Sequence, residues 1–354
     1  MSETSLVPPA TLRETLVRLA PGTGLRDGLE RIQRGRTGAL IVLGDDPAVI
    51  DVCDGGITFD VPFAPTLLRE LSKMDGAVVL STDCTRIIKA NVQLVPSPSY
   101  PTGESGTRHR SAERTALQTG RPVIAVSASM NTITLYVEGQ RYVLVEPAAI
   151  MTRANQQLGT MERYRTRLDL ANQRLFVAEM NNYATVSDVI SVVQRELLLK
   201  RAGQDLDRDV LELGTDARQL ALQLTELRGD NDTQINLLVR DYLVCPGVPS
   251  AEDVAEVTAA LDRLPDSQLL TPAPIARALN LPGTEETLVR EIVPRGYRAL
   301  ARVPRVQEFL MDHLIEAFGD LNGLLEASVE EIAEADNVSS LWARHVHEGL
   351  QRLS

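Results

Sequence analysis

A short basic segment of this chain has the residue types that bind a triphosphate. Residues 107–111 read Thr-Arg-His-Arg-Ser and follow a glycine-rich stretch. Thr107 is predicted to cap a helix, which would leave the first backbone N–H groups and the positive helix end facing an anion. Arg108 and Arg110 add planar guanidinium groups that suit phosphate oxygens. The alternative is a solvated helix turn whose arginines pair with neighbouring glutamates, and this segment alone does not decide between them.

A carboxylate upstream of this segment could complete a site for ATP. Asp75 and Gly76 come just before the apolar run 77–80, which begins with Ala77 and predicts a buried strand. A carboxylate at the tip of a strand can hold Mg²⁺ or Mn²⁺ and draw a ribose hydroxyl toward ionisation. Gly76 lacks a Cβ, so we expect it to let a ribose approach closely. An Asp-Gly turn before a strand is common, and this signal gains force only beside the two arginines.

Short apolar runs alternate with turn residues up to Pro147, which is typical of an α/β domain. We expect strands at 39–43, 77–80, 86–95, 122–127, 132–137 and 141–146. We expect helices at 11–19, 25–34, 66–73 and 108–119. The predicted fold class is therefore a multidomain α+β protein, whose N-terminal α/β domain at residues 1–147 has a central mixed sheet flanked by helices.

Residues 148–284 are predicted to form an all-α spine, because glycine becomes rare and apolar residues recur at helical spacing. Steps of four and three residues connect one apolar seam: Leu206, Val210, Leu213, Ala217, Leu220, Leu224 and Leu227. Such a seam predicts one helix packed against another and ending at Gly229. The partner helix could belong to the same chain or to a second subunit, and the spacing does not decide.

Residues 285–354 are predicted to form a small helical module. Its helices are expected at 297–301, 304–318, 329–335 and 341–353. Between residues 297 and 354 there are five basic residues against ten acidic ones. That balance is unfavourable for a surface that must attract nucleic acid.

Composition limits the classes of protein to which the chain can belong. With 354 residues, 44% hydrophobic and 24% charged, it is predicted to be a folded protein of several domains. A formal charge of −12 means that any anion site must be built locally. The three cysteines lie far apart, so neither a disulfide framework nor a zinc site is expected. Because we see no leader sequence and no apolar run of membrane length, we expect a cytoplasmic protein without membrane partners. Because there is no Walker A motif, we do not expect a P-loop ATPase.

The Asp75-Gly76-Ala77 turn and the basic segment at 107–111 together resemble segments of the bacterial diadenylate cyclases of the DNA integrity scanning family. The resemblance spans nearly the whole chain and is carried by three segments: DGA at 75–77, KANVQLVPSPSYPTGESGTRHRSAER at 89–114 and VIAVSASMNTITLYVEG at 123–139. The order of cyclase domain, helical spine and helix-hairpin-helix domain also agrees. Ser111 departs from the threonine usual in relatives but keeps a hydroxyl group.

The resemblance implies condensation of two ATP molecules into cyclic di-AMP with release of two diphosphates. By position, Asp75 would bind Mg²⁺ or Mn²⁺, and Arg108 and Arg110 would join it as catalytic residues. The resemblance assigns the remaining nucleotide contacts to Gly76, Ala77, Leu94, Thr107, His109, Ser111 and, as a weaker candidate, Ser127. Each 3′-hydroxyl must attack the α-phosphate of the other nucleotide, so two sites must face each other. In the family this occurs in a homo-octamer of two tetramers.

The resemblance also implies DNA as a partner, bound through a Gly-x-Gly hairpin near the C-terminus. Here the matching positions are Asn337, Val338 and Ser339, with Arg344 nearby. A serine side chain stands where a phosphate must approach, so binding of branched or damaged DNA is expected to be weak and strongly salt-dependent. An alternative function is that of a DNA-binding or scaffolding oligomer whose nucleotide site is only regulatory.

Overall fold

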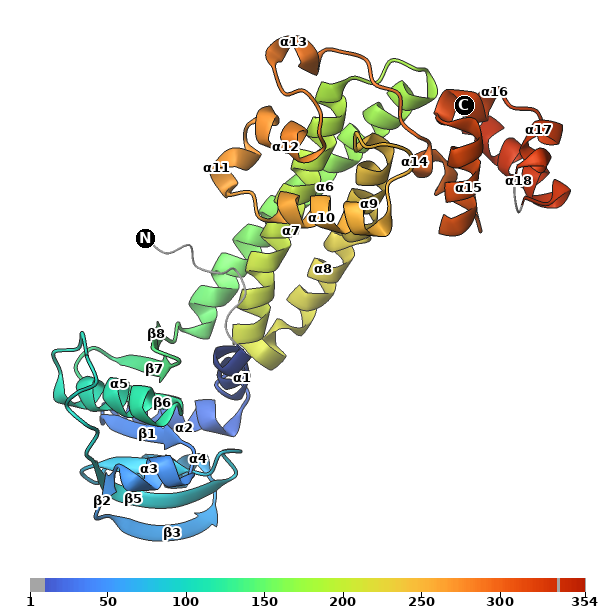
Figure 1. The fold of residues 1–354 in the computed structure, drawn as a ribbon. Coiled ribbons are helices and arrows are strands. Elements are labelled where there is room, and N and C mark those ends of the chain that lie inside the picture. Colours follow the sequence, from blue (N-terminus) through green and yellow to red (C-terminus); the bar gives the residue numbers. More distant parts are fainter. Residues whose placement is uncertain (1–9, 336–337, 354) are drawn as a thin grey trace. The chain divides into compact units, whose positions relative to one another are not determined.

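The computed structural model describes residues 10–335 and 338–353, shown in Figure 1. These residues form two compact units. The first unit contains the described chain up to Gln156 together with Asp205–Gln223, and the second contains Gln157–Gln204 and the described chain from Leu224 onward.

A mixed β-sheet is the centre of the first unit. Its eight described strands are β1 (Ala39–Leu43), β2 (Cys53–Asp54), β3 (Ile57–Pro62), β4 (Ala77–Leu80), β5 (Arg86–Leu94), β6 (Val123–Ser127), β7 (Thr132–Val137) and β8 (Gln140–Val143). The order is β2-β5-β4-β1-β6-β7-β8, and β3 also pairs with β5. Strands β1 and β4 are parallel, whereas the other described pairs are antiparallel. The predicted mixed sheet is confirmed.

Helices cover both faces of this sheet. The cluster on one face joins α1 (Ala10–Arg18), α2 (Gly24–Arg34) and α4 (Pro65–Leu71) to alternate strand residues such as Ile41. The cluster on the other face joins α3 (Pro47–Asp51) and α5 (Thr107–Thr119) to the intervening residues, such as Leu40 and Val42. The alternation follows from the two-residue period of a strand, which turns successive side chains to opposite faces.

Two strands and one helix of this unit were not predicted. Strand β3 is exposed or half-buried along its length and ends in a proline, so it lacks the buried apolar pattern that marks a central strand. Strand β2 spans only two residues, and α3 spans five. The strand predicted at 141–146 is shorter than expected, because β8 ends at Val143 and a helix begins at Pro147.

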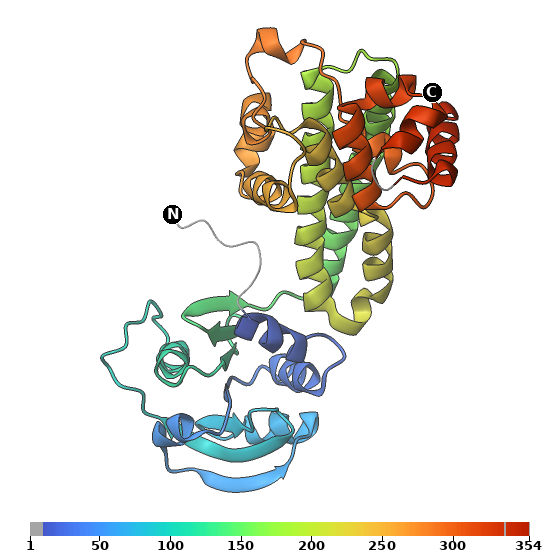
Figure 2. The ribbon, with the colours of Figure 1, turned by 45° about the vertical axis from the view of Figure 1, so that its right-hand side comes forward.

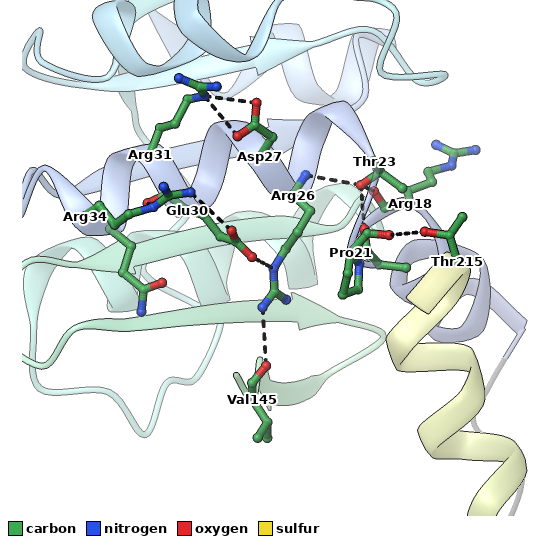
Figure 3. Close-up of polar contacts among 12 residues, drawn as sticks. Arg18, Pro21, Thr23, Arg26, Asp27, Glu30, Arg31, Arg34, Val145 and Thr215 are labelled. Atoms are coloured by element: carbon green, nitrogen blue, oxygen red, sulfur yellow. Dashed lines mark hydrogen bonds and ion pairs between the residues drawn. The ribbon is translucent and has the colours of Figure 1, made fainter. Parts of the chain in front are cut away.

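Helix α2 is held in the first unit by polar contacts at its start (Figure 3). Thr23 Oγ1 accepts a hydrogen bond from the backbone N of Arg26 at 3.2 Å, which caps the helix. The Arg26 guanidinium donates to Glu30 at 2.8 Å and to the Val145 carbonyl at 3.4 Å. These contacts tie the helix to the segment that follows β8.

Most of the predicted seam is buried, but it does not lie on one helix. Helix α7 (Val186–Leu213) ends where a 3₁₀ turn, η1 (Gly214–Ala217), begins, and α8 (Arg218–Arg228) follows. Gly214 has φ +53°, and a Cβ on it would lie 2.6 Å from Ala20 Cβ, so the chain bends at a residue that only glycine suits. The prediction of one uninterrupted helix is wrong. Buried members such as Leu213 and Leu220 are covered within the chain itself.

The remaining elements are helical. Helix α6 (Pro147–Met180) lies beside α7 in Figures 1 and 2. The other helices are α9 (Asn231–Tyr242), α10 (Ala251–Asp262), α11 (Asp266–Leu269), α12 (Pro272–Ala278), α13 (Glu285–Leu288), α14 (Tyr297–Leu300), α15 (Glu308–Phe318), α16 (Leu321–Glu326), α17 (Val329–Glu334) and α18 (Ser340–Gln351). The four predicted C-terminal helices are present, although residues 304–307 precede α15 instead of belonging to it. Among the described helices, none combines the length and apolarity needed to cross a bilayer.

Buried polar contacts attach the C-terminal helices to the rest of the second unit. The Asp241 carboxylate accepts hydrogen bonds from the backbone N–H groups of Gly296 at 2.7 Å, Tyr297 at 2.7 Å and Arg298 at 2.9 Å. The Arg298 guanidinium donates to Glu179 at 2.6 Å, and both side chains are buried. The start of α14 is therefore fixed by one carboxylate on α9.

Candidate functional site

The register of the strands places most of the predicted site at one end of the sheet. Ile41 of β1 lies opposite Val78 of the parallel strand β4, so both strands start at this end. Ala39 lies opposite Val126 of the antiparallel strand β6, whose last residue, Ser127, is therefore beside the start of β1. Asp75, just before β4, and Ser127, at the end of β6, therefore lie at the same end of the sheet.

Asp75 and Leu94 lie at this same end. Ala77, at the start of β4, is opposite Val92 of β5, so continuing the antiparallel register brings Leu94 level with Asp75. Asp75 is exposed and forms no hydrogen bond or ion pair with the described residues. Leu94 and Ala77 are buried in the cluster on the α5 face. Asp75 is therefore a free carboxylate next to buried apolar residues.

Gly76 is required for a different reason from the one predicted. Its φ is +104°, and a Cβ on it would lie 2.6 Å from the Val92 carbonyl oxygen. The space on the Cβ side of Gly76 is therefore filled by the backbone of β5, while Gly76 itself is exposed, and the close approach of a ribose stays a prediction. Glycine at this position lets the chain turn Asp75 out of the sheet while β4 pairs closely with β5.

The N-cap of α5 lies one residue before the expected one. Gly106, with φ −79° and ψ 136°, is the cap residue, and no side chain accepts a hydrogen bond there. Thr107 is the first helical residue, so its predicted role as N-cap is wrong. Because Gly106 has no side chain to fill this position, the leading N–H groups of a 13-residue helix keep their capacity to bind an anion.

Arg108 lies across the start of β1. A Cβ on Gly38 would lie 2.6 Å from the Cζ atom of Arg108, so the guanidinium occupies the space that Gly38 leaves empty. Arg108 is exposed and has no hydrogen-bond or ion-pair partner among the described residues. Because of this contact, the start of α5 lies at the same end of the sheet as Asp75 and Ser127.

The glutamates that could have neutralised the arginines have other partners. The Glu104 carboxylate accepts hydrogen bonds from Tyr136 and Arg141, each at 2.7 Å. The Glu113 carboxylate accepts from the Thr102 hydroxyl and, at 3.2 Å, from a backbone N–H group. Arg110 is exposed, and its Nε donates only to the backbone carbonyl of Glu104 at 3.4 Å. In the described chain, Arg108 and Arg110 thus form no ion pair, which favours the interpretation as an anion site over that of a neutralised turn.

His109 points inward between these two outward arginines. It is 8% exposed, and its Nδ1 atom lies 2.8 Å from the Tyr136 hydroxyl. Burial lowers the pKa of His109 below its ordinary 6.5, so the ring is neutral near pH 7. Its Nε2 atom is buried without a hydrogen-bond partner among the described residues. His109 is therefore not a third phosphate-binding cation.

The two serines of the predicted site have different environments. Ser127 is 8% exposed, and its hydroxyl accepts a hydrogen bond from the backbone N of Met130 at 3.2 Å. Ser111 is half-buried near the start of α5, and its hydroxyl has no hydrogen-bond partner among the described residues. Ser127 shapes the turn after β6, whereas Ser111 is free to contact a ligand.

The donor set at this end of the sheet fits a metal that the substrate itself helps to hold. The described residues contain no group of three or more His, Cys, Asp or Glu side chains that could hold a metal ion by themselves. Asp75 is one free carboxylate, and Mg²⁺ in nucleotide sites is commonly held by one or two carboxylates plus substrate phosphates. The residues present therefore suit Mg²⁺ or Mn²⁺ as a companion of a bound triphosphate.

Sequence reasoning missed the three residues that fix the glycine-rich loop: Glu104, Tyr136 and Arg141. Tyr136 and Arg141 are direct cross-strand partners in the β7–β8 hairpin. The sequence predicts that hairpin, but nothing in it indicates that a loop some thirty residues earlier in the chain would lie against its face. Only the three-dimensional arrangement reveals this contact.

The residues predicted to touch DNA differ in their exposure, because Ser339 and Arg344 are exposed and Val338 is buried. Asn337 lies outside the described residues, and Val338 is 7% exposed in the core of the C-terminal helices. The Ser339 hydroxyl accepts from the backbone N of Trp342 at 3.4 Å and caps α18. Arg344 is exposed without a partner among the described residues.

Two family models match the chain. Residues 26–141 match the nucleotide-binding region of the DisA bacterial checkpoint controller, and residues 144–288 match the linker region of the same controller. The first match contains the site at the end of the sheet.

Whole-length relatives are also similar to the chain. The DNA integrity scanning protein DisA of Corynebacterium efficiens is 63% identical over 97% of both chains. That of Corynebacterium glutamicum is 62% identical over 97% of this chain and 94% of its own, and that of a Parafrankia strain is 51% identical over 97% and 95%. A solved structure of a DacA variant from Staphylococcus aureus is 24% identical, covers 39% of this chain and 91% of its own, and has a TM-score of 0.31.

Proposed function

The chain belongs to the DisA family of DNA integrity scanning proteins, and from this membership we propose that it is a diadenylate cyclase that converts two ATP molecules into cyclic di-AMP. The single observation that carries the proposal is the convergence of Asp75 and Arg108 at one end of the sheet. Each has its charge unpaired within the described chain. Metal-assisted nucleotide chemistry needs a carboxylate that can hold the ion and guanidinium groups that can neutralise phosphate charge, and both are free at this end of the sheet.

The reaction joins two nucleotides through two new phosphodiester bonds. The 3′-hydroxyl oxygen of each ATP attacks the α-phosphorus of the other, the bond from that phosphorus to the diphosphate breaks, and the hydroxyl proton is lost to solvent. Two diphosphates leave. One site has the groups for one nucleotide, so ring closure requires two copies of the site face to face, and we propose a homo-oligomer, an octamer, that supplies them.

Different residues of the site would bind different parts of the nucleotide. Arg108 and Arg110 would hold phosphate oxygens and offset the negative charge that grows as the diphosphate leaves. The N–H groups at the start of α5, with Thr107 and Ser111, would bind the remaining phosphate oxygens. Leu94 would line the adenosine site, and Ala77, which has no exposed surface, would support it from within the core.

We propose Mg²⁺ or Mn²⁺ as the metal, held by Asp75 and by the phosphates of the substrate. When bound, the ion lowers the pKa of the hydroxyl that it contacts and neutralises phosphate charge. The exposure of Asp75, and the lack of a partner for it in the described chain, support this role. With ATP as substrate, we also propose a cytoplasmic location.

Incubation of the purified protein with ATP tests the proposal directly. We expect mass spectrometry to detect cyclic di-AMP and diphosphate in a one-to-two ratio when Mg²⁺ or Mn²⁺ is present. Linear pppApA that accumulates without cyclic product would mean that the first phosphodiester bond forms between two bound nucleotides but the second, ring-closing bond does not. If neither ion supports any product, while ATP still binds, the alternative function holds, namely a scaffold whose nucleotide site regulates its assembly.

DNA binding is proposed as a weak property of the C-terminal helices. Of the five arginines in residues 297–353, Arg298 is buried against Glu179 and Arg352 pairs with Glu348. The guanidinium of Arg302 lies 3.5 Å from the centre of the Phe176 ring. Arg305 and Arg344 remain exposed without partners in the described chain. So few available cations release few counterions, and the affinity should be low at physiological salt.

A titration with branched and linear duplexes at low and physiological salt tests this property. We expect binding at low salt that weakens by at least about tenfold at physiological salt, with any remaining affinity coming from several modules of one oligomer. Replacing Arg305 and Arg344 with glutamine should remove most of the low-salt binding, whereas Arg352→Gln serves as the paired-charge control. Tight binding of the double variant at physiological salt would refute the proposal.

A further inference from the structure

The loop before α5 is fastened to the β7–β8 hairpin through one carboxylate. Glu104 Oε1 accepts a hydrogen bond from the Tyr136 hydroxyl at 2.7 Å and one from Arg141 Nε at 2.7 Å. Tyr136 and Arg141 are direct cross-strand partners, so their side chains extend from the same face of the hairpin. Two neighbouring donors on a rigid sheet therefore hold one carboxylate two residues before the Gly106 cap.

The same tyrosine determines the protonation of His109. The Tyr136 hydroxyl has one proton, and it donates that proton to Glu104. Its oxygen can then only accept from the imidazole 2.8 Å away, so we assign the proton of neutral His109 to Nδ1. Nε2 is left as a bare acceptor, buried and without a partner among the described residues. The chain of contacts thus sets both the tautomer and the ring orientation of His109.

The orientation of His109 sets that of its neighbours. Residues 108–110 lie in the first turn of α5, where successive side chains leave the helix about 100° apart. A ring fixed inward at His109 consequently directs Arg108 and Arg110 outward. The ring also faces the cap, because a Cβ on Gly106 would lie 3.9 Å from His109 Cδ2. The backbone of the loop adds a further link, since the Glu104 carbonyl accepts from Arg110 Nε at 3.4 Å.

From these contacts we infer that Glu104, Tyr136 and Arg141 are positioning residues that orient the phosphate-binding turn of α5. The inference rests on the proposed function, because it concerns how the turn holds ATP. None of the three side chains needs to touch the nucleotide. The hairpin acts as a rigid support, so the arginines are aligned before ATP arrives and less conformational freedom is lost on binding.

Tyr136→Phe is the variant that tests the inference, because it removes one oxygen and keeps the ring. We expect the KM for ATP to rise about tenfold, the effect of losing one hydrogen bond to a charged group, with kcat changed less than about threefold. Glu104→Gln should act in the same direction. In ¹⁵N spectra of histidine-labelled protein, His109 should change from the pure Nδ1–H tautomer to a mixture.

Tyr142→Phe is the matched control on the neighbouring strand. The Tyr142 hydroxyl also donates to a buried carboxylate of the same unit, that of Glu212, but it has no contact with the loop. Both variants should lose similar stability, and only Tyr136→Phe should change the KM and the His109 spectrum. Equal KM values in the two variants, or an unchanged His109 tautomer in Tyr136→Phe, would overturn the inference.

The outcome can be separated from that of the proposed function. Equilibrium binding of ATP with Mg²⁺ is measured beside product formation in the wild-type protein and in both variants. If the wild-type protein binds ATP but makes no cyclic di-AMP, the proposed reaction fails, while the binding and tautomer measurements still decide the role of Tyr136.

Discussion

The guanidinium of Arg108 occupies the space that a side chain at Gly38 would need. A Cβ on Gly38 would lie 2.6 Å from Arg108 Cζ, and Gly38 does not have the left-handed backbone that only glycine tolerates well. The contact with Arg108 thus gives Gly38 a reason to be glycine. The contact links α5 to the start of β1, and with it the arginine to the end of the sheet at which Asp75 lies.

Gly38→Ala should therefore impair ATP binding more than folding. The new methyl group meets the flexible end of an arginine, so the guanidinium moves and the fold is kept. We expect the KM for ATP to rise about five- to tenfold while the thermal unfolding midpoint changes by less than about 2 °C. Gly159→Ala on α6, where a Cβ meets nothing within 4 Å, is the control. A large fall in the unfolding midpoint with an unchanged KM would contradict this role of Gly38.

Asp75→Asn should abolish product without disturbing the assembly. Asparagine keeps the size of the side chain and removes the charge that would hold a divalent ion, and Asp75 has no partner in the described chain to lose. We expect cyclic di-AMP formation to fall by at least about a hundredfold, the effect of losing a group that stabilises charge in the transition state. Size-exclusion chromatography with light scattering should give an unchanged mass. Asp51→Asn, exposed on α3, is the control, and a dissociated Asp75→Asn oligomer would make Asp75 structural instead.

How far the sequence could predict this site depends on the range of the contacts involved. The residues before β4 and at the start of α5 were predicted because local patterns mark strand entries and helix starts. The support from Gly38, Glu104, Tyr136 and Arg141 was not predicted, since it depends on which strands become neighbours. The cap was misplaced by one residue, as helix ends often are, because threonine and glycine both suit the position.

The interruption of the long seam shows a similar limit. Leu213 and Leu220 keep helical spacing on both sides of Gly214, so periodicity alone indicates one helix. The break is imposed by close packing between Gly214 and Ala20, which are far apart in the sequence. Strand β3 escaped prediction for the opposite reason, because it is largely exposed and carries little apolar pattern.

The stability of the first unit should fall as the pH drops below about 6.5, in part because of His109. Burial lowers the pKa of His109 from 6.5, so the unfolded chain binds a proton at a higher pH than the folded chain does. The free energy of unfolding is then unaffected by this group above pH 6.5 and decreases as the pH falls from 6.5 toward the lower pKa of the folded state.

Hydrogen exchange followed by mass spectrometry can measure this effect in peptides from α5 and β7. Protection should decrease between about pH 7.5 and 5.5, after correction for the intrinsic exchange rate. In His109→Gln the group that titrates is gone, so the decrease should be smaller. Identical pH dependence in the wild-type protein and His109→Gln would show that His109 does not contribute.

Asp241→Asn should destabilise the second unit strongly. The Asp241 carboxylate is buried and accepts three backbone N–H groups at the start of α14, and an amide can accept at only one of its two positions. We expect the free energy of unfolding to fall by on the order of 3 kcal/mol, because buried donors lose their acceptor and the buried Arg298 loses a nearby negative charge.

The one tryptophan of the chain, Trp342, lies in this unit, so its fluorescence reports urea unfolding of the C-terminal helices. Asp253→Asn is the control: Asp253 also completes a helix cap, but on the surface at the start of α10, and its loss should shift the midpoint far less. Equal midpoints for the two variants would show that the Asp241 contacts do not hold α14 in place.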